Sequence, residues 1–177
     1  MKKQRLVLLS DLWVQQQSEW IQSYLEQLEP HFNCVYYDVA ALAGISTQDS
    51  FAAEIHAAFV QGGIDRAVQA LLNLEKKKTI VLAFSIGGTI AWKAALKGLP
   101  TISLTAVSST RLRKEYQKPT CEIALHFGDQ DVNRPQDEWF EALEIYPEIH
   151  FAQQHEFYML ESACKMICDQ LIEQFGS

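Results

Sequence analysis

The 177-residue sequence lacks the features of several classes of protein. No hydrophobic run approaches the roughly 20 residues that a membrane-spanning helix requires, so we expect no membrane segment. Acidic residues outnumber basic ones, and the net charge of −7 repels a phosphate backbone, so nucleic acid is not expected as a partner. Neither a G-x-G-x-x-G nor a Walker sequence is present, which leaves a nucleotide site without support.

Cysteine is scarce, and its spacing excludes the usual metal and redox motifs. The four cysteines, Cys34, Cys121, Cys164 and Cys168, form no C-x-x-C pair. The first two fall in predicted strands, where a free cysteine behaves as a small buried hydrophobe. The last two share one face of a predicted helix, which gives half of a metal site, but no histidine partner is nearby. We assign all four to packing, and the sequence implies no metal and no organic cofactor.

The start of the chain lacks a complete signal peptide. A basic N-terminus is followed by a short apolar run that breaks at Ser10 and Asp11, with no small-residue cleavage site after it. We therefore expect residues 5–9 to form the first strand of a cytoplasmic protein.

The composition, 48% hydrophobic and 21% charged, is typical of a globular protein, and residues 1–177 are long enough for one domain with a sizeable core. Strands alternate with helices along the whole chain, which predicts an α/β fold: a three-layer α/β/α sandwich with a mostly parallel sheet of about six strands. The predicted strands are 5–9, 34–37, 79–84, 101–107, 121–127 and 149–152. The predicted helices are 18–28, 51–60, 65–75, 89–96, 135–145 and 157–175.

A serine follows the central strand at a sharp strand-to-helix turn. Ser85 has Ala83 two residues before it and Gly87 two residues after it, with Gly88 next. Such a turn strains the backbone of its central residue and requires small neighbours, so that the helix passes close to the strand. The pattern A-x-S-x-G-G differs by one methyl group from the G-x-S-x-G nucleophile elbow. It predicts an exposed, nucleophilic hydroxyl on Ser85.

A base and a carboxylate follow later strands. Ligands of a parallel sheet meet the loops at the carboxyl ends of its strands, and Asp131 and His155 both fall on such loops. An imidazole that titrates near neutrality can take the proton of an attacking Ser85, and a carboxylate fixes the imidazole tautomer. We expect His155 to be the base and Asp131 the acid. Asp129 is the alternative acid; the G-x-x-D spacing favours Asp131 and makes Asp129 a turn residue.

The chain order Ser85, Asp131, His155, together with the A-x-S-x-G-G turn and the Gly-Asp-Gln-Asp loop, resembles the α/β-hydrolase superfamily, in particular its small, lidless serine hydrolases. The resemblance implies a minimal α/β-hydrolase fold without a cap, because 108–120, where many members insert a lid, is only a polar loop. It implies hydrolysis of a small ester or thioester through an acyl-enzyme on Ser85, with a small-molecule acyl substrate as partner.

An oxyanion hole needs two backbone donors. The N–H of Ile86 begins the helix after the serine, and the second donor should be the N–H of Leu12, or that of Asp11. Here the sequence departs from the family, whose usual His-Gly is replaced by Ser10-Asp11, and a carboxylate would oppose a developing oxyanion. The alternative is therefore a catalytically silent α/β-hydrolase-fold protein that binds a ligand or a protein partner. A third interpretation treats 85–89, at a helix N-terminus, as an anion cradle.

The other charged and imidazole side chains have less specific interpretations. Arg111, Arg113 and Lys114 lie in the polar segment near the predicted site, either as a solvated loop or as an attraction for an anionic acyl substrate. His126 and His150 fall in predicted strands and are expected to be packed or edge residues. His31 and His56 are expected on helix surfaces.

Overall fold

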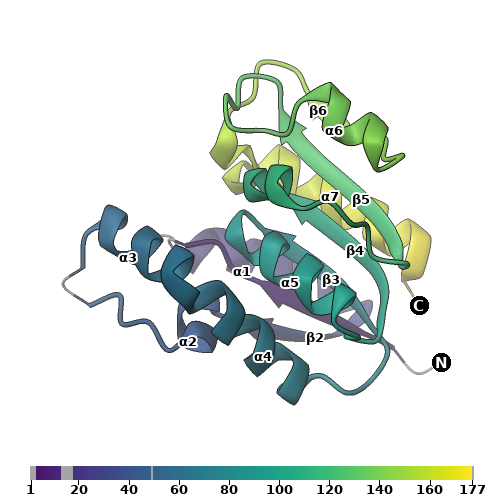
Figure 1. Cartoon of the computed structure of the whole chain (residues 1–177). Helices are drawn as coiled ribbons and strands as arrows, with labels where there is room; N and C mark the ends of the chain where they lie inside the picture. Colours follow the sequence, from purple (N-terminus) through teal and green to yellow (C-terminus); the bar gives the residue numbers. More distant parts are fainter. Residues whose placement is uncertain (1–2, 13–17, 49, 177) are drawn as a thin grey trace.

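A computed structural model describes residues 3–12, 18–48 and 50–176 of the chain. In this part of the chain, six strands form one sheet in the order β2-β1-β3-β4-β5-β6, and each neighbouring pair is parallel (Figure 1). The expected α/β sandwich is thus confirmed, with a sheet that is parallel throughout. The strands are β1 (Gln4–Leu9), β2 (Phe32–Tyr37), β3 (Thr79–Phe84), β4 (Thr101–Val107), β5 (Glu122–Gly128) and β6 (Glu148–His150).

Helices cover both faces of the sheet. One face carries α1 (Ser18–Leu28) and α7 (Glu161–Phe175), and the other carries α2 (Val39–Ala43), α4 (Ile64–Leu74) and α5 (Ile86–Leu96) (Figure 1). Two shorter helices are α3 (Ala52–Ala58) and α6 (Asp137–Ala142), both of which contribute to the α5 side.

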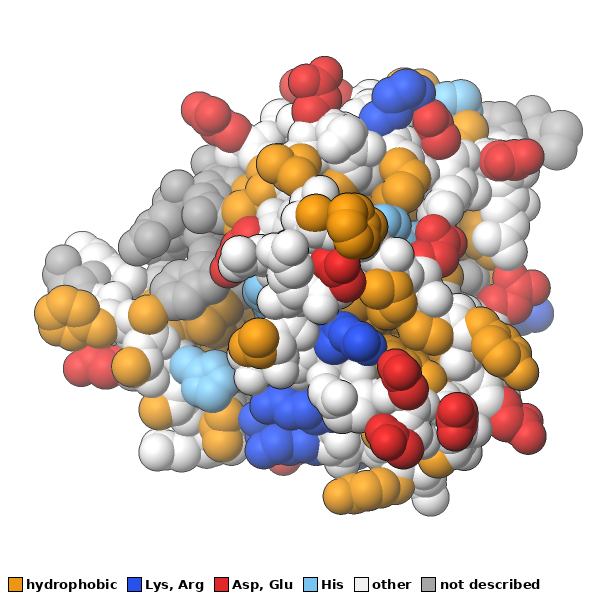
Figure 2. Space-filling model, turned by 90° about the horizontal axis from the view of Figure 1, so that it is seen from above, with side chains coloured by type: hydrophobic (Ala, Val, Ile, Leu, Met, Phe, Trp, Pro, Cys, Tyr) orange, Lys and Arg blue, Asp and Glu red, His pale blue; other side chains and the backbone are white. Residues whose placement is uncertain are grey.

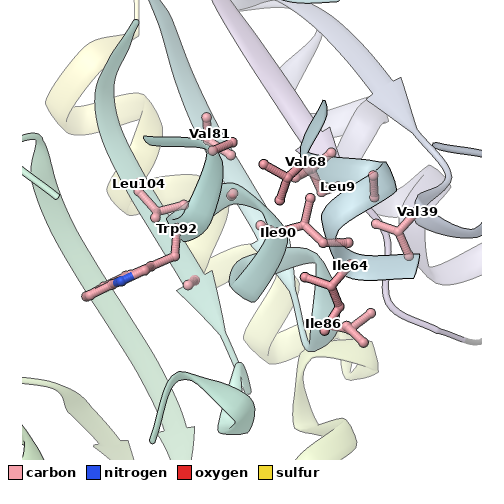
Figure 3. Close-up of a cluster of buried hydrophobic side chains, with 14 of the residues drawn as sticks. Leu9, Val39, Ile64, Val68, Val81, Ile86, Ile90, Trp92 and Leu104 are labelled. Atoms are coloured by element: carbon pink, nitrogen blue, oxygen red, sulfur yellow. The ribbon is translucent and has the colours of Figure 1, made fainter. Parts of the chain in front are cut away.

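The apolar strands supply both layers of the core. Successive side chains of a strand point to opposite faces, so a central strand of a covered sheet must be apolar throughout. In β3, Val81 joins the core under α4 and α5, whereas Ile80 and Leu82 join the core under α1 and α7. Figure 3 shows the first of these layers, with Ile90 of α5 packed among side chains from the sheet and from α4.

Several boundaries differ from those expected from the sequence. The last strand is shorter, and the final helix begins at Glu161, because a separate 3-10 turn occupies His155–Met159 and Leu160 has an extended backbone. The helix expected over 135–145 is limited to α6. The helix α2 was not expected; it is capped by Asp38, whose carboxylate accepts the N–H of Ala40 at 2.7 Å.

The gap expected between the helices 51–60 and 65–75 is present, and it falls at Gly62 and Gly63. Gly62 adopts φ of 116°, a conformation that side chains disfavour, in the wide turn Phe59–Gly63 that separates α3 from α4. None of the helices described is both long and apolar enough to cross a membrane.

Candidate active site

The backbone of Ser85 is strained where β3 passes into α5. Its φ and ψ are 49° and −118°, a region that costs a non-glycine residue about 1–3 kcal/mol. The surrounding sheet holds it there, since the N–H of Ser85 donates to the carbonyl of Val107 at 2.8 Å. A methyl group on Gly87 would collide with the carbonyl of Ser10, and one on Gly88 would collide with Ser109. The two glycines after the serine are therefore required by the close approach of α5 to the neighbouring loops.

The structure brings Ser85, His155 and Asp131 together, although they lie far apart in the sequence. Ser85 Oγ is 2.9 Å from His155 Nε2, and His155 Nδ1 is 2.6 Å from Asp131 Oδ2. The three side chains follow β3, β5 and β6. Because the strands are parallel, their carboxyl ends lie at the same end of the sheet. A hydroxyl, an imidazole and a carboxylate are thus hydrogen-bonded in series, an arrangement that can move a proton away from the hydroxyl.

Asp131 is stabilised as a carboxylate. Burial opposes its ionisation, but the hydrogen bond and the charge of His155 outweigh it and lower the pKa of Asp131. The N–H of Asn133, which donates to Oδ1 at 3.0 Å, and the nearby Arg113 act in the same direction. An ionised Asp131 keeps a proton on His155 Nδ1 and leaves Nε2 to accept one from Ser85.

Asp129, the alternative acid, has a different place. Its Oδ1 accepts the N–H of Gln153 at 3.2 Å, so it ties the loop after β5 to the loop that carries His155. Ser108 holds the same loop from the other side, since its hydroxyl donates to the carbonyl of His155 at 2.6 Å. Both residues hold the backbone of the loop that carries His155, Asp129 at Gln153 and Ser108 at His155 itself, and neither contact was predicted from the sequence.

The Ser10-Asp11 loop directs its carboxylate toward an aromatic partner. Asp11 is only 1% exposed, and its Oδ2 accepts the hydroxyl of Tyr158 at 2.7 Å. Burial, followed by the charge of Asp11, raises the pKa of Tyr158 well above its ordinary value, so the phenol remains a donor. Ser10 Oγ donates to the carbonyl of Asp11 at 2.9 Å and accepts the N–H of Val39 at 3.0 Å, which fixes the loop at the end of β1.

The serine opens onto a cavity of about 390 Å³. The two residues expected to supply oxyanion donors, Leu12 and Ile86, both line it next to Ser85 and His155. His56 lies exposed on α3, as expected, and also lines the cavity. Asn133, which the sequence did not single out, belongs to the wall too. The full lining is Leu12, His56, Ser85, Ile86, Thr110, Arg111, Arg113, Asn133 and His155.

The cavity wall is basic in an acidic protein. Arg111 and Arg113 come from the 3-10 turn Thr110–Lys114, which follows β4, and His56 comes from α3. On the face seen in Figure 2, one cluster of Lys and Arg side chains lies beside a histidine, while other basic side chains and the acidic ones are spread over the rest of the face. Such a wall attracts a negatively charged group.

Comparisons with known proteins agree with this architecture at the level of the fold. No family model matches the chain, and no curated protein matches it. A Xanthomonas campestris protein assigned to the alpha/beta hydrolase superfamily has 15% identity and a TM-score of 0.68, over 97% of this chain and 99% of that one.

Two further solved structures are similar. P91, a dienelactone hydrolase-like promiscuous phosphotriesterase from metagenomic libraries, has 14% identity and a TM-score of 0.71, over 99% and 88% of the two chains. Est1E from Butyrivibrio proteoclasticus, solved with ferulic acid bound, has 12% identity and a TM-score of 0.68, over 98% and 88%. The chain therefore has the α/β-hydrolase fold, in a form that the shortest of these three neighbours matches almost end to end.

Proposed function

We propose that the protein is a serine hydrolase that cleaves a small ester or thioester through an acyl-enzyme on Ser85. The observation that carries this proposal is the pair of short contacts that link Ser85 to His155 and His155 to Asp131. The strained turn at Ser85 supports it, because such strain persists at a functional position when the surrounding structure holds it in place. The likeness of the fold to hydrolases is a further support.

The first half of the proposed reaction forms the acyl-enzyme. Ser85 Oγ bonds to the substrate carbonyl carbon while its proton passes to His155 Nε2. The resulting imidazolium is stabilised by Asp131 and then gives the proton to the departing alcohol or thiol. In the second half, His155 takes a proton from water, the hydroxide attacks the acyl carbon, and Ser85 leaves with the proton.

The oxyanion is assigned to the backbone N–H groups of Ile86 and Leu12. Each such donor is worth about 3–4 kcal/mol of barrier. The placement of the Asp11 carboxylate against Tyr158 supports this assignment, because it directs the charge of the altered loop into a hydrogen bond with a phenol. The replacement of His-Gly by Ser10-Asp11 is thereby compatible with catalysis.

The basic wall supports a substrate that carries a negative group away from the reacting carbonyl. Arg113 is held as part of that wall, since its guanidinium donates to the carbonyls of Thr110 at 2.8 Å and Asn133 at 3.3 Å. Arg111 lines the same cavity. We expect Arg111→Gln to raise KM for a p-nitrophenyl ester with a terminal carboxylate about tenfold, and to leave KM for the uncharged isostere unchanged.

Fluorophosphonate labelling tests the proposal directly. The folded protein is expected to form a covalent adduct on Ser85 that mass spectrometry locates, and Ser85→Ala is expected to abolish it. Ser162→Ala, at an exposed position in the first turn of α7, is the matched control and is expected to label like the wild type.

A panel of p-nitrophenyl esters of increasing chain length then defines the acyl preference of the same preparations. A folded wild-type protein that forms no adduct and hydrolyses no ester would instead support the catalytically silent, ligand-binding alternative.

A further inference from the structure

Two histidines and a glutamate converge at the outer edge of the sheet, away from the serine. In the register of β5 and β6, His126 lies opposite Glu148, and Gly128 lies opposite His150. Since alternate residues of a strand share a face, Glu148 and His150 project to the same side, and His126 projects beside them. One donor atom from each of the three side chains lies within 4.8 Å of the others.

We propose that His126, Glu148 and His150 bind a divalent transition-metal ion of the zinc type. Two imidazole nitrogens and one carboxylate oxygen form a donor set that zinc uses when it keeps an open position. This proposal is independent of the serine chemistry, and it gives His126 and His150, which lie as expected at a buried and an edge position, a further role.

The spacing of the donor atoms fits one ion. Zinc bonds to nitrogen and oxygen are about 2.0–2.2 Å long, so two ligands of a tetrahedral ion lie roughly 3.3–3.5 Å apart. His126 Nδ1 is 3.2 Å from His150 Nε2 and 3.6 Å from Glu148 Oε2. These two values bracket the required separation, and the third pair of donor atoms, from His150 and Glu148, lies within 4.8 Å.

Neighbouring side chains hold two of the three ligands in position. Gln170 of α7 donates to both carboxylate oxygens of Glu148, at 3.1 and 3.2 Å, which orients the carboxylate. The ring of His150 packs against that of Phe157, with centroids 4.7 Å apart. Groups that orient metal ligands in this way affect affinity by about 10–100-fold.

An entry path leads to the cluster. A cavity of about 430 Å³ lies between the sheet and α7, and both His126 and Glu148 line it, together with Thr105 and Gln170. His126 itself is buried, whereas the Glu148 side chain is half exposed. An ion can therefore arrive from solvent and bind Glu148 first. The buried imidazole of His126 then adds a further ligand.

The position of the cluster gives the ion a consequence for the proposed active site. β6 is three residues long, lies at the edge of the sheet, and is followed within five residues by His155. An ion bound by both His126 of β5 and His150 of β6 would link the two strands and fix the start of the loop that carries His155. We expect the ion to stabilise this edge of the sheet.

Metal titration of the full chain tests the proposal. After removal of metals with EDTA, isothermal titration with ZnCl₂ is expected to give one ion per chain, and CoCl₂ is expected to give the visible absorption of cobalt with nitrogen ligands. Glu148→Gln, which keeps the size of the side chain, should weaken zinc binding at least tenfold, and His150→Ala should abolish it. Gln170→Ala should weaken it about tenfold.

Two controls separate this site from other ligands. His31→Ala removes a histidine outside the cluster, and Cys164→Ser removes the cysteine pair on α7; both should bind zinc like the wild type. Zinc should also raise the melting temperature of the wild type but not that of His150→Ala. Absence of zinc binding to the folded wild type, or binding that survives Glu148→Gln and His150→Ala, would overturn the proposal.

Discussion

The two halves of the proposed active site are built by different means. Ser85 follows β3, a central strand whose residues are all buried, and its conformation is imposed by the sheet and by the close passage of α5. His155 follows β6, a short edge strand. Its loop is positioned by two hydrogen bonds, one donated by the N–H of Gln153 to Asp129 and one donated by the Ser108 hydroxyl to the carbonyl of His155. The proposed nucleophile thus depends on local backbone packing, whereas the proposed base depends on contacts between distant loops.

The largest effect is expected when the base itself is removed. His155→Ala should lower kcat for ester hydrolysis by about 10⁵-fold or more, because the imidazole proposed to take the Ser85 proton is lost. Steady-state kinetics with a p-nitrophenyl ester measure it, and His31→Ala serves as control. A His155→Ala protein within tenfold of the wild type would mean that another group activates the serine.

The next largest effect separates the two aspartates. Asp131→Asn should lower kcat by about 10⁴-fold, because an amide favours the wrong imidazole tautomer. Asp129→Asn keeps an oxygen that can accept the N–H of Gln153, so it should cost less than tenfold. Equal losses in the two variants would contradict the assignment of Asp131 as the acid and of Asp129 as a residue that only holds the loop.

Much of the central region was predictable from the sequence, for a physical reason. The elbow could be recognised in a short stretch of sequence. Ala83, Gly87 and Gly88, all close to Ser85, are the small residues that the tight turn requires. The bounds of α1 and β4 also agree with the predictions, because each combines a clear apolar pattern with a nearby proline. The three candidate residues of the site could also be located, because each one follows a predicted strand of a parallel sheet.

The edge region and the cavity wall were less predictable, because they depend on contacts between distant segments. The bond from Tyr158 to Asp11 joins residues 147 positions apart, and no local pattern indicates it. His56 lines the cavity because α3 lies beside the loops that follow the carboxyl ends of the strands. The convergence of His126 with His150 needed the strand register, which a sequence alone does not give.

Two glycine substitutions compare the rigidity of the regions. A methyl group on Gly87 meets the backbone of Ser10 and the side chain of Leu9, both fixed by the sheet, so Gly87→Ala should lower the free energy of unfolding by about 3 kcal/mol. On Gly128 it meets the carbonyls of Gln153 and Gln154, which are also backbone atoms, so Gly128→Ala should cost about as much, again about 3 kcal/mol. Urea unfolding measures both. A much smaller loss in Gly128→Ala would show that the loop after β6 yields where the loop after β1 does not.

The smallest effect is a pH dependence of stability that belongs to the edge region. The pKa of Asp131 is lower in the folded protein than in the unfolded chain, so its ionisation stabilises the fold above the unfolded value, about 4. This contribution is lost as the pH falls through the folded pKa. The difference in unfolding free energy between wild type and Asp131→Asn should therefore be larger at neutral pH than in acid. The same comparison in a His155→Ala background should give a smaller change, because the hydrogen bond and charge that lower the pKa are gone. A difference that is constant with pH would mean that the charge of Asp131 beside His155 does not contribute to the stability of the fold.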